Sequence, residues 1–237
     1  MTTIPYSITY GLETLSFDLL FSRRKTMQIA AYPDGKVVVK APEGVPLEEV
    51  KKRVLRRSRW IKSKLDYFQQ FKPRTPPRHY ISGETHLYLG KQYRLKVLTG
   101  AAPSVKLRRG WLTVSVKNND APAVVKTLLD RWYAEKAAQH FDAAFERCWH
   151  LFEKQGFLRP NLKIRMMKTR WGSLSSKGNL TLNTKLVCAP RECIDYVLTH
   201  ELCHLAHRNH GPSFYRLLEQ TMPDWKKHKS KLELSLV

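Results

Sequence analysis

The chain has 237 residues, of which 42% are hydrophobic, with 11 glycines and 13 prolines, and this composition is typical of a globular protein and not of a disordered one. It contains no apolar run of about eighteen residues, so no membrane span is expected, and its N-terminus lacks the pattern of a secretory signal, which favours a cytoplasmic location. The 42 Lys and Arg residues against 20 Asp and Glu give a formal net charge of +22, which indicates anionic partners but no particular chemistry.

Residues 1–117 are expected to form a β-rich region with one basic helix. MQIAAYPDGKVVVKAP (27–42) has a Pro-Asp-Gly turn between two β-prone runs, which predicts a hairpin. Beyond Pro46, apolar residues recur at helical spacing and predict an amphipathic helix over about residues 46–71. The other faces of this helix carry Lys51, Lys52, Arg53, Arg56, Arg57, Arg59, Lys62 and Lys64. Two interpretations stay open for them: a solvated surface, or a surface that binds nucleic acid phosphates.

KPRTPPR (72–78) is predicted to be a linker, because three prolines in seven residues cannot continue a helix. THLYLGKQYRLKVL and SVKLRRGWLTVSV each predict two short strands joined at a turn, and we find no internal repeat. Asn118-Asn119-Asp120 then opens a long helical stretch with a thick apolar stripe. We expect residues 118–237 to form a second, metal-binding domain.

Residues 162–186 are predicted to form a β-hairpin that turns at Ser-Lys-Gly-Asn. Its second strand would place Leu180, Leu182, Thr184 and Leu186 on one face. Pro190 is expected to begin the next helix.

That helix runs into HELCHLAHRNH (200–210), which has the H-E-x-x-H arrangement of zinc hydrolases. His200 and His204 lie four residues apart, so in a helix both face the same side, as two ligands of one metal must. Glu201 would be placed to reach a water on the metal without binding the metal itself.

A catalytic zinc needs a third protein ligand, and the sequence offers two candidates. His207 lies on nearly the same helical face as His204 but about two turns from His200, a long reach for a compact site. His210 follows Asn209 and precedes Gly211-Pro212, where the helix is expected to break and the chain to fold back. This favours His210, and His207 is then expected to line the cleft or support a ligand.

TRWGSLSSKGNLTLNTKL followed by HELCHLAHRNHGPSFYRLLE resembles the YgjP-like family of bacterial metallopeptidases, which is similar to the SprT and WLM minimal zincins. The resemblance implies an α+β fold with a zincin-like catalytic domain, in which the H-E-x-x-H helix packs on a backing helix and a short β-sheet. It also implies one catalytic Zn²⁺ held by His200, His204 and His210, with Glu201 as general base. The residues expected to contact substrate are Arg170, Trp171, Ser173, Asn183 and His207.

These observations favour a zinc-dependent hydrolase, a metallopeptidase acting on peptides or proteins. A metal-dependent nucleoside triphosphate hydrolase is an alternative, because the positive charge suits anionic substrates. A second alternative is a nucleic-acid-binding protein with accessory zinc, based on the basic helix. The sequence gives no indication of an oligomeric state.

Overall fold

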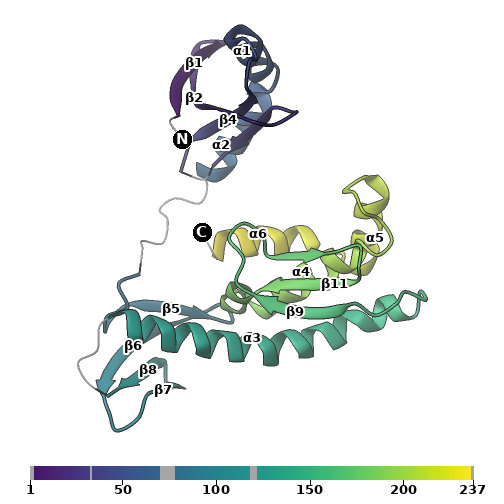
Figure 1. Ribbon diagram of the computed structural model, residues 1–237. Coiled ribbons are helices and arrows are strands. Elements are labelled where there is room, and N and C mark those ends of the chain that lie inside the picture. The colour runs from purple at the N-terminus through teal and green to yellow at the C-terminus, as the bar shows by residue number, and fades with distance from the viewer. Residues whose placement is uncertain (1–2, 33, 70–77, 118–121, 236–237) are drawn as a thin grey trace. The chain divides into compact units, whose positions relative to one another are not determined.

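The computed structural model describes residues 3–32, 34–69, 78–117 and 122–235, and the chain divides into two compact units, Met1–Thr75 and Pro76–Val237 (Figure 1). The predicted linker KPRTPPR lies outside the described residues except for Arg78, as does the predicted helix start at Asn118-Asn119-Asp120.

The first unit is a four-stranded sheet covered by two helices. Its strands are β1 (Ile4–Tyr10), β2 (Glu13–Ser22), β3 (Gln28–Ala31) and β4 (Val37–Pro42), in the order β1-β2-β4-β3. Strands β3 and β4 form the predicted hairpin, and β2 pairs with β4 in parallel. Alternate strand residues pack against the helices in a core made of Phe17, Leu19, Val37, Val39, Ala41, Val50, Val54 and Ile61.

The basic helix is divided in two, α1 (Leu47–Arg56) and α2 (Ser58–Gln69), whereas the sequence predicted one helix over residues 46–71. At the break, the Arg57 N–H bonds to the Val54 carbonyl three residues back, at 3.0 Å, so the last turn of α1 tightens. The buried Ser58 hydroxyl donates to the same carbonyl at 3.2 Å. Val54 of α1 and Ile61 of α2 pack in the same core.

The second unit begins with another four-stranded sheet. Strands β5 (Thr85–Tyr88), β6 (Lys91–Thr99), β7 (Ser104–Arg108) and β8 (Trp111–Val116) lie in the order β5-β6-β8-β7, which confirms both predicted strand pairs. The long helix α3 (Pro122–Glu153) packs on this sheet, and Leu112 and Val114 share a core with Val125 and Leu129. Because of this shared core the structure divides at 75/76, which differs from the expected boundary at 117/118.

The two sheets repeat one arrangement, so the conclusion that the chain has no internal repeat is wrong. In each sheet the first two strands are antiparallel, the second and fourth are parallel, and the third and fourth are antiparallel. A helix follows each sheet. Buried residues recur at a constant offset along the chain, in the pairs Val37 and Leu112, Val39 and Val114, Ala41 and Val116, Val50 and Val125, and Val54 and Leu129. Only two of these five pairs are identical, Val39 with Val114 and Val50 with Val125, so the repeat is not evident from the sequence.

The rest of the second unit surrounds one helix, α4 (Arg191–Cys203), which Pro190 precedes as predicted. Helices α3, α5 (Pro212–Thr221) and α6 (Trp225–Ser235) pack on α4, together with strands β10 (Gly172–Leu174) and β11 (Asn179–Asn183) (Figure 1). On α3, Arg147 forms an ion pair with Asp195 of α4 at 2.8 Å. The α+β class, with the H-E-x-x-H helix on a backing helix and a short sheet, is therefore confirmed.

The predicted hairpin over 162–186 is only partly correct. Strand β9 (Asn161–Arg165) pairs with β11 in parallel, and the antiparallel partner of β11 is the short strand β10. Leu180 and Leu182 are buried on β11 as expected, but Thr184 and Leu186 lie in a 3₁₀ helix, η1 (Thr184–Cys188). The strand ends because the Asn183 side chain caps η1 by accepting a hydrogen bond from the Lys185 N–H.

No helix in the described ranges is long and apolar enough to cross a membrane.

The β5–β6 turn holds the start of α4 in place. The Leu89 and Gly90 N–H groups donate to the carbonyls of Val187 and Cys188 at 2.9 and 3.0 Å. Gly90 has φ +76°, and a Cβ atom there would lie 2.6 Å from Cγ of Pro190. The turn thus requires glycine both for its backbone conformation and for its contact with Pro190.

We therefore expect Gly90→Ala to lower the free energy of unfolding by about 1–3 kcal/mol more than Gly110→Ala, because only the first adds a steric overlap to the backbone strain. Gly110 is the matched control, since it has φ +82° and open space around its Cα. Urea unfolding of both variants measures the difference, and equal losses would contradict the docking role of this turn.

Candidate metal centre

The H-E-x-x-H segment lies at the C-terminal end of α4. The helix ends at Cys203 with His204 as its C-cap, earlier than the break expected at Asn209. Residues 204–206 continue in tighter turns, in which the N–H groups of His204, Leu205 and Ala206 bond to carbonyls three residues back. Helix α5 begins at Pro212, so the intervening loop brings His210 back towards α4.

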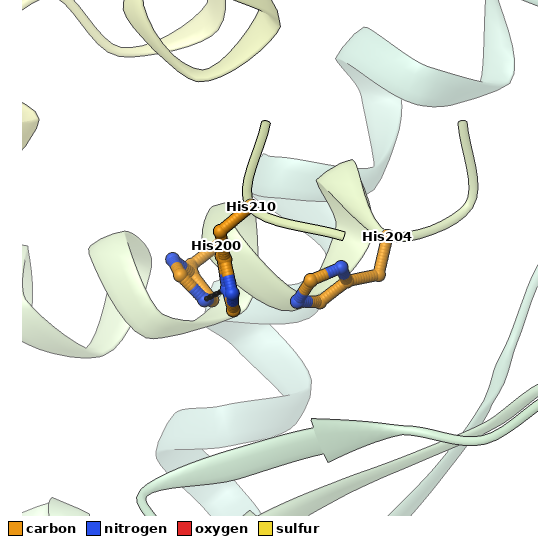
Figure 2. Close-up of side chains that lie close together, drawn as sticks. All are labelled: His200, His204 and His210. Atoms are coloured by element: carbon orange, nitrogen blue, oxygen red, sulfur yellow. Dashed lines mark hydrogen bonds between the residues drawn. The ribbon is translucent and has the colours of Figure 1, made fainter. Parts of the chain in front are cut away.

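The side chains of His200, His204 and His210 converge (Figure 2). One ring nitrogen from each lies within 4.8 Å of the others, and Nε2 of His200 is 2.9 Å from Nε2 of His210. The buried Phe214 ring packs against all three imidazoles, with ring centroids 4.7–5.0 Å apart. His207 does not belong to this group.

The backbone of His207 orients one of the three imidazoles. Nδ1 of His204 lies 2.9 Å from the His207 carbonyl oxygen, so this nitrogen carries the hydrogen and donates it. The other nitrogen, Nε2, is then left with a lone pair for a metal. His207 thus supports a candidate ligand through its carbonyl group.

The protonation of the histidines suits metal binding. Burial, followed by the charges of His210, His204 and Lys229, lowers the pKa of His200 to about 4. Burial also lowers the pKa of His210, with smaller contributions from His204 and Lys229. Both imidazoles are therefore neutral near pH 7, which is the form that binds metals.

The spacing of the three imidazoles fits a zinc ion. Tetrahedral zinc, with Zn–N bonds of about 2.0–2.1 Å, separates its nitrogen ligands by about 3.3 Å. The observed nitrogen positions need only small ring movements to reach that spacing. Three protein ligands leave the fourth position of the zinc for water or substrate, as in catalytic sites.

Glu201 is buried beside this cluster, with 8% of its surface exposed. Burial raises its pKa to about 7, against the opposing effects of a hydrogen bond from the Leu174 N–H and the charge of Arg170. Gly172 makes room for this side chain, because a Cβ atom at position 172 would lie 2.7 Å from Cγ of Glu201. The glycine of the R-W-G-S stretch thus has a steric function that sequence reasoning missed.

A cleft of about 470 Å³ lies over the histidines and Glu201. It is lined by Arg170, Gly172, Ser173, Leu174, Ser175, Ser176, His200, Glu201, His204, Arg208 and His210. Of the residues expected to contact substrate, Arg170 and Ser173 line this cleft, whereas Trp171, Asn183 and His207 do not. Sequence reasoning missed Arg208, Ser175 and Ser176, because nothing in their spacing distinguishes them from ordinary loop residues.

Asn183 does not line the cleft but holds the backbone of a segment that does. It is 3% exposed, and its Nδ2 donates to the carbonyls of Met167 and Arg170, both at 2.8 Å. The half-buried Trp171 packs against the main core of the second unit. Both side chains therefore hold the segment that carries Arg170 into β10.

Comparison with known proteins identifies the family. The model of the YgjP-like metallopeptidase domain matches residues 25–235, which span both units. Two crystal structures of metallopeptidase zymogens match 41% of this chain. Jannalysin from Methanocaldococcus jannaschii is 24% identical, with a TM-score of 0.36 and 90% of its chain covered. Abylysin from Pyrococcus abyssi is 27% identical, with a TM-score of 0.34 and 99% of its chain covered.

The search of curated proteins found no match. The family match covers far more than half of the chain and includes the histidine cluster, Glu201 and the R-W-G-S stretch that first pointed to it. The resemblance seen in the sequence is thus confirmed, and the chain belongs to the YgjP-like family of metallopeptidases.

Proposed function

We propose that this metallopeptidase is zinc-dependent, that His200, His204 and His210 hold one catalytic Zn²⁺, and that Glu201 is its general base. The observation that carries the proposal is the convergence of three imidazole nitrogens within 4.8 Å at the floor of a cleft that Glu201 also lines. When bound, zinc would supply Lewis-acid chemistry, lowering the pKa of a water molecule and polarising the scissile carbonyl.

Glu201 would move the proton in this reaction. Its burial favours a pKa near neutrality, and a cation nearby would lower that value, so the side chain is a carboxylate at neutral pH. A carboxylate at the cleft floor can take a proton from the attacking water and deliver it to the leaving amine. The Leu174 N–H bond keeps Glu201 aimed at the cleft during this transfer.

Strand β10 would align the substrate. The Trp171 carbonyl accepts from the Asn183 N–H, and the Ser175 N–H donates to the Asn179 carbonyl, so alternate residues bond to β11. The backbone groups of Gly172 and Leu174 consequently face the other way, and both residues line the cleft. Because the Leu174 N–H donates to Glu201, the Gly172 backbone and the Leu174 carbonyl are the groups that this edge can offer to a substrate. An extended peptide can add a strand at this edge, which would bring its scissile carbonyl over the metal centre.

Removal of the base should abolish turnover without removing the metal. We expect Glu201→Gln to lower kcat/KM for any cleaved peptide by about 10²–10⁴-fold, because glutamine cannot accept the proton. Zinc content, measured by atomic spectrometry, should equal that of the wild type, since Glu201 is not a ligand in the proposal. Undiminished hydrolysis by the zinc-loaded variant would refute the role of Glu201.

Gly172→Ala should impair the same proton transfer, because its methyl group would displace Glu201. The added methyl group would overlap Cγ and Oε1 of Glu201, at 2.7 and 2.9 Å, and displace the carboxylate. We expect activity to fall by at least about tenfold while zinc is retained. Gly178→Ala, in the β10–β11 turn with open space around it, is the matched control and should keep most of the activity.

The two candidates for the third ligand can be separated directly. We expect His210→Ala to lose zinc on dialysis against a weak chelator, because it removes one of three ligands. His207→Ala should retain zinc, since the variant keeps the backbone carbonyl that orients His204. The reverse pattern of zinc contents would overturn the choice of His210.

A further inference from the structure

The cleft over the metal centre has an unusual charge balance. Its only acidic side chain among the described lining residues is Glu201, which is buried in the floor. Two arginines line it, Arg170 from the segment before β10 and Arg208 from the loop between His204 and His210. The walls of a cleft with this lining favour anionic groups of a substrate over cationic ones.

Within the described part of the chain the two guanidinium groups make no hydrogen bond and no ion pair, although the charge of Arg170 acts on Glu201. Other arginines of this unit pair with carboxylates, as Arg131 does with Glu135, Arg147 with Asp195 and Arg159 with Glu146. Arg170 and Arg208 are exposed and form neither an ion pair nor a side-chain hydrogen bond with any described residue. Their donors are therefore free to bind a ligand.

We propose that Arg208, together with Arg170, selects peptides that carry an Asp or Glu side chain close to the scissile bond. Guanidinium groups bind carboxylates through paired, charge-assisted hydrogen bonds, which are stronger than neutral ones. A lysine at the same place in the peptide would meet two positive charges and no carboxylate on the cleft wall. The assignment rests on the proposed peptidase function and names the substrate class of the same cleft.

A peptide fits this cleft better than another anion because of the edge of β10. The Gly172 backbone and the Leu174 carbonyl can pair with an extended chain, whereas a nucleotide has no peptide backbone to pair with a strand edge. Arg170 precedes this strand by two positions, so a peptide aligned on β10 would pass beside its guanidinium group.

Matched peptides test the selection. A cleaved peptide is made with Asp, Asn or Lys at each position flanking the scissile bond, and kcat/KM is measured for each. At one flanking position or more we expect the wild type to prefer Asp over Asn on the order of tenfold and to cleave the Lys peptide most slowly. Arg208→Gln should bring the Asp to Asn ratio towards one, and Arg208→Glu should place Lys above Asp.

Arg108→Gln is the matched control, because it makes the same change of net charge on β7, outside the residues that line the cleft. It should keep the wild-type ratio. Zinc content is checked for every variant, and if Arg208→Glu loses zinc, Arg170→Glu provides the same charge reversal from the other segment. A reversal of preference distinguishes recognition from a merely structural effect, which would slow all peptides alike.

Binding gives a readout that does not depend on turnover. Fluorescent Asp, Asn and Lys peptides are titrated with zinc-loaded Glu201→Gln protein, with and without the Arg208 substitutions, at low and high salt. We expect the Asp peptide to bind more tightly than the other two, and Arg208→Glu to remove this difference. That result would support the selection of acidic peptides even if no peptide were hydrolysed and the proposed function were therefore wrong. Equal binding and equal cleavage of the three peptides would overturn it. The proposal would also be overturned if the protein released phosphate from nucleoside triphosphates in a reaction that depends on Arg208, and did not distinguish the three peptides.

Discussion

The burial of α4 is the constraint on which the candidate metal centre depends. Strands and helices pack around it, and most of its residues, from Cys193 to Cys203, are buried. The polar side chains of His200 and Glu201 are carried in the same turn, where they face the cleft. A helix enclosed in this way cannot rotate or slide without opening the core, so its last turn holds two imidazoles and a carboxylate at fixed positions.

This arrangement has a desolvation cost, because the carboxylate of Glu201 is largely removed from water. The Leu174 N–H and the charge of Arg170 compensate in part, and Gly172 provides the space. One short strand therefore has three effects. It leaves space for the Glu201 side chain at Gly172, donates a hydrogen bond to Glu201 from Leu174, and lines the cleft.

The two copies of the repeated sheet make different contacts. In the second copy the β5–β6 turn bonds to Val187 and Cys188 and touches Pro190, so that the sheet anchors the start of α4. In the first copy the corresponding β1–β2 turn exposes Leu12 fully, and a Cβ atom at Gly11 would meet nothing within 4 Å. The same scaffold thus positions α4 in the second unit, whereas in the first unit it packs against α1 and α2.

Local spacing alone predicted much of the candidate site. The i, i+4 relation of His200 and His204, the position of Glu201 between them and the helix start at Pro190 follow from helical periodicity. The strand pairs and the hairpin at 27–42 follow from turn residues between β-prone runs. These features depend on residues close together in the chain, and the sequence therefore determines them by itself.

Other features depend on contacts between residues that are distant in the chain. The sequence did not reveal that β9 lies parallel to β11, that the helix ends at Cys203, or that Gly172 lies against Glu201. It also assigned the second sheet to the N-terminal region, although Leu112 packs on α3. The sequence by itself determined the spacing of the three histidines that we propose as metal ligands. Only the tertiary structure decided how they are enclosed and what charge surrounds them, because burial is set by the packing of the whole unit.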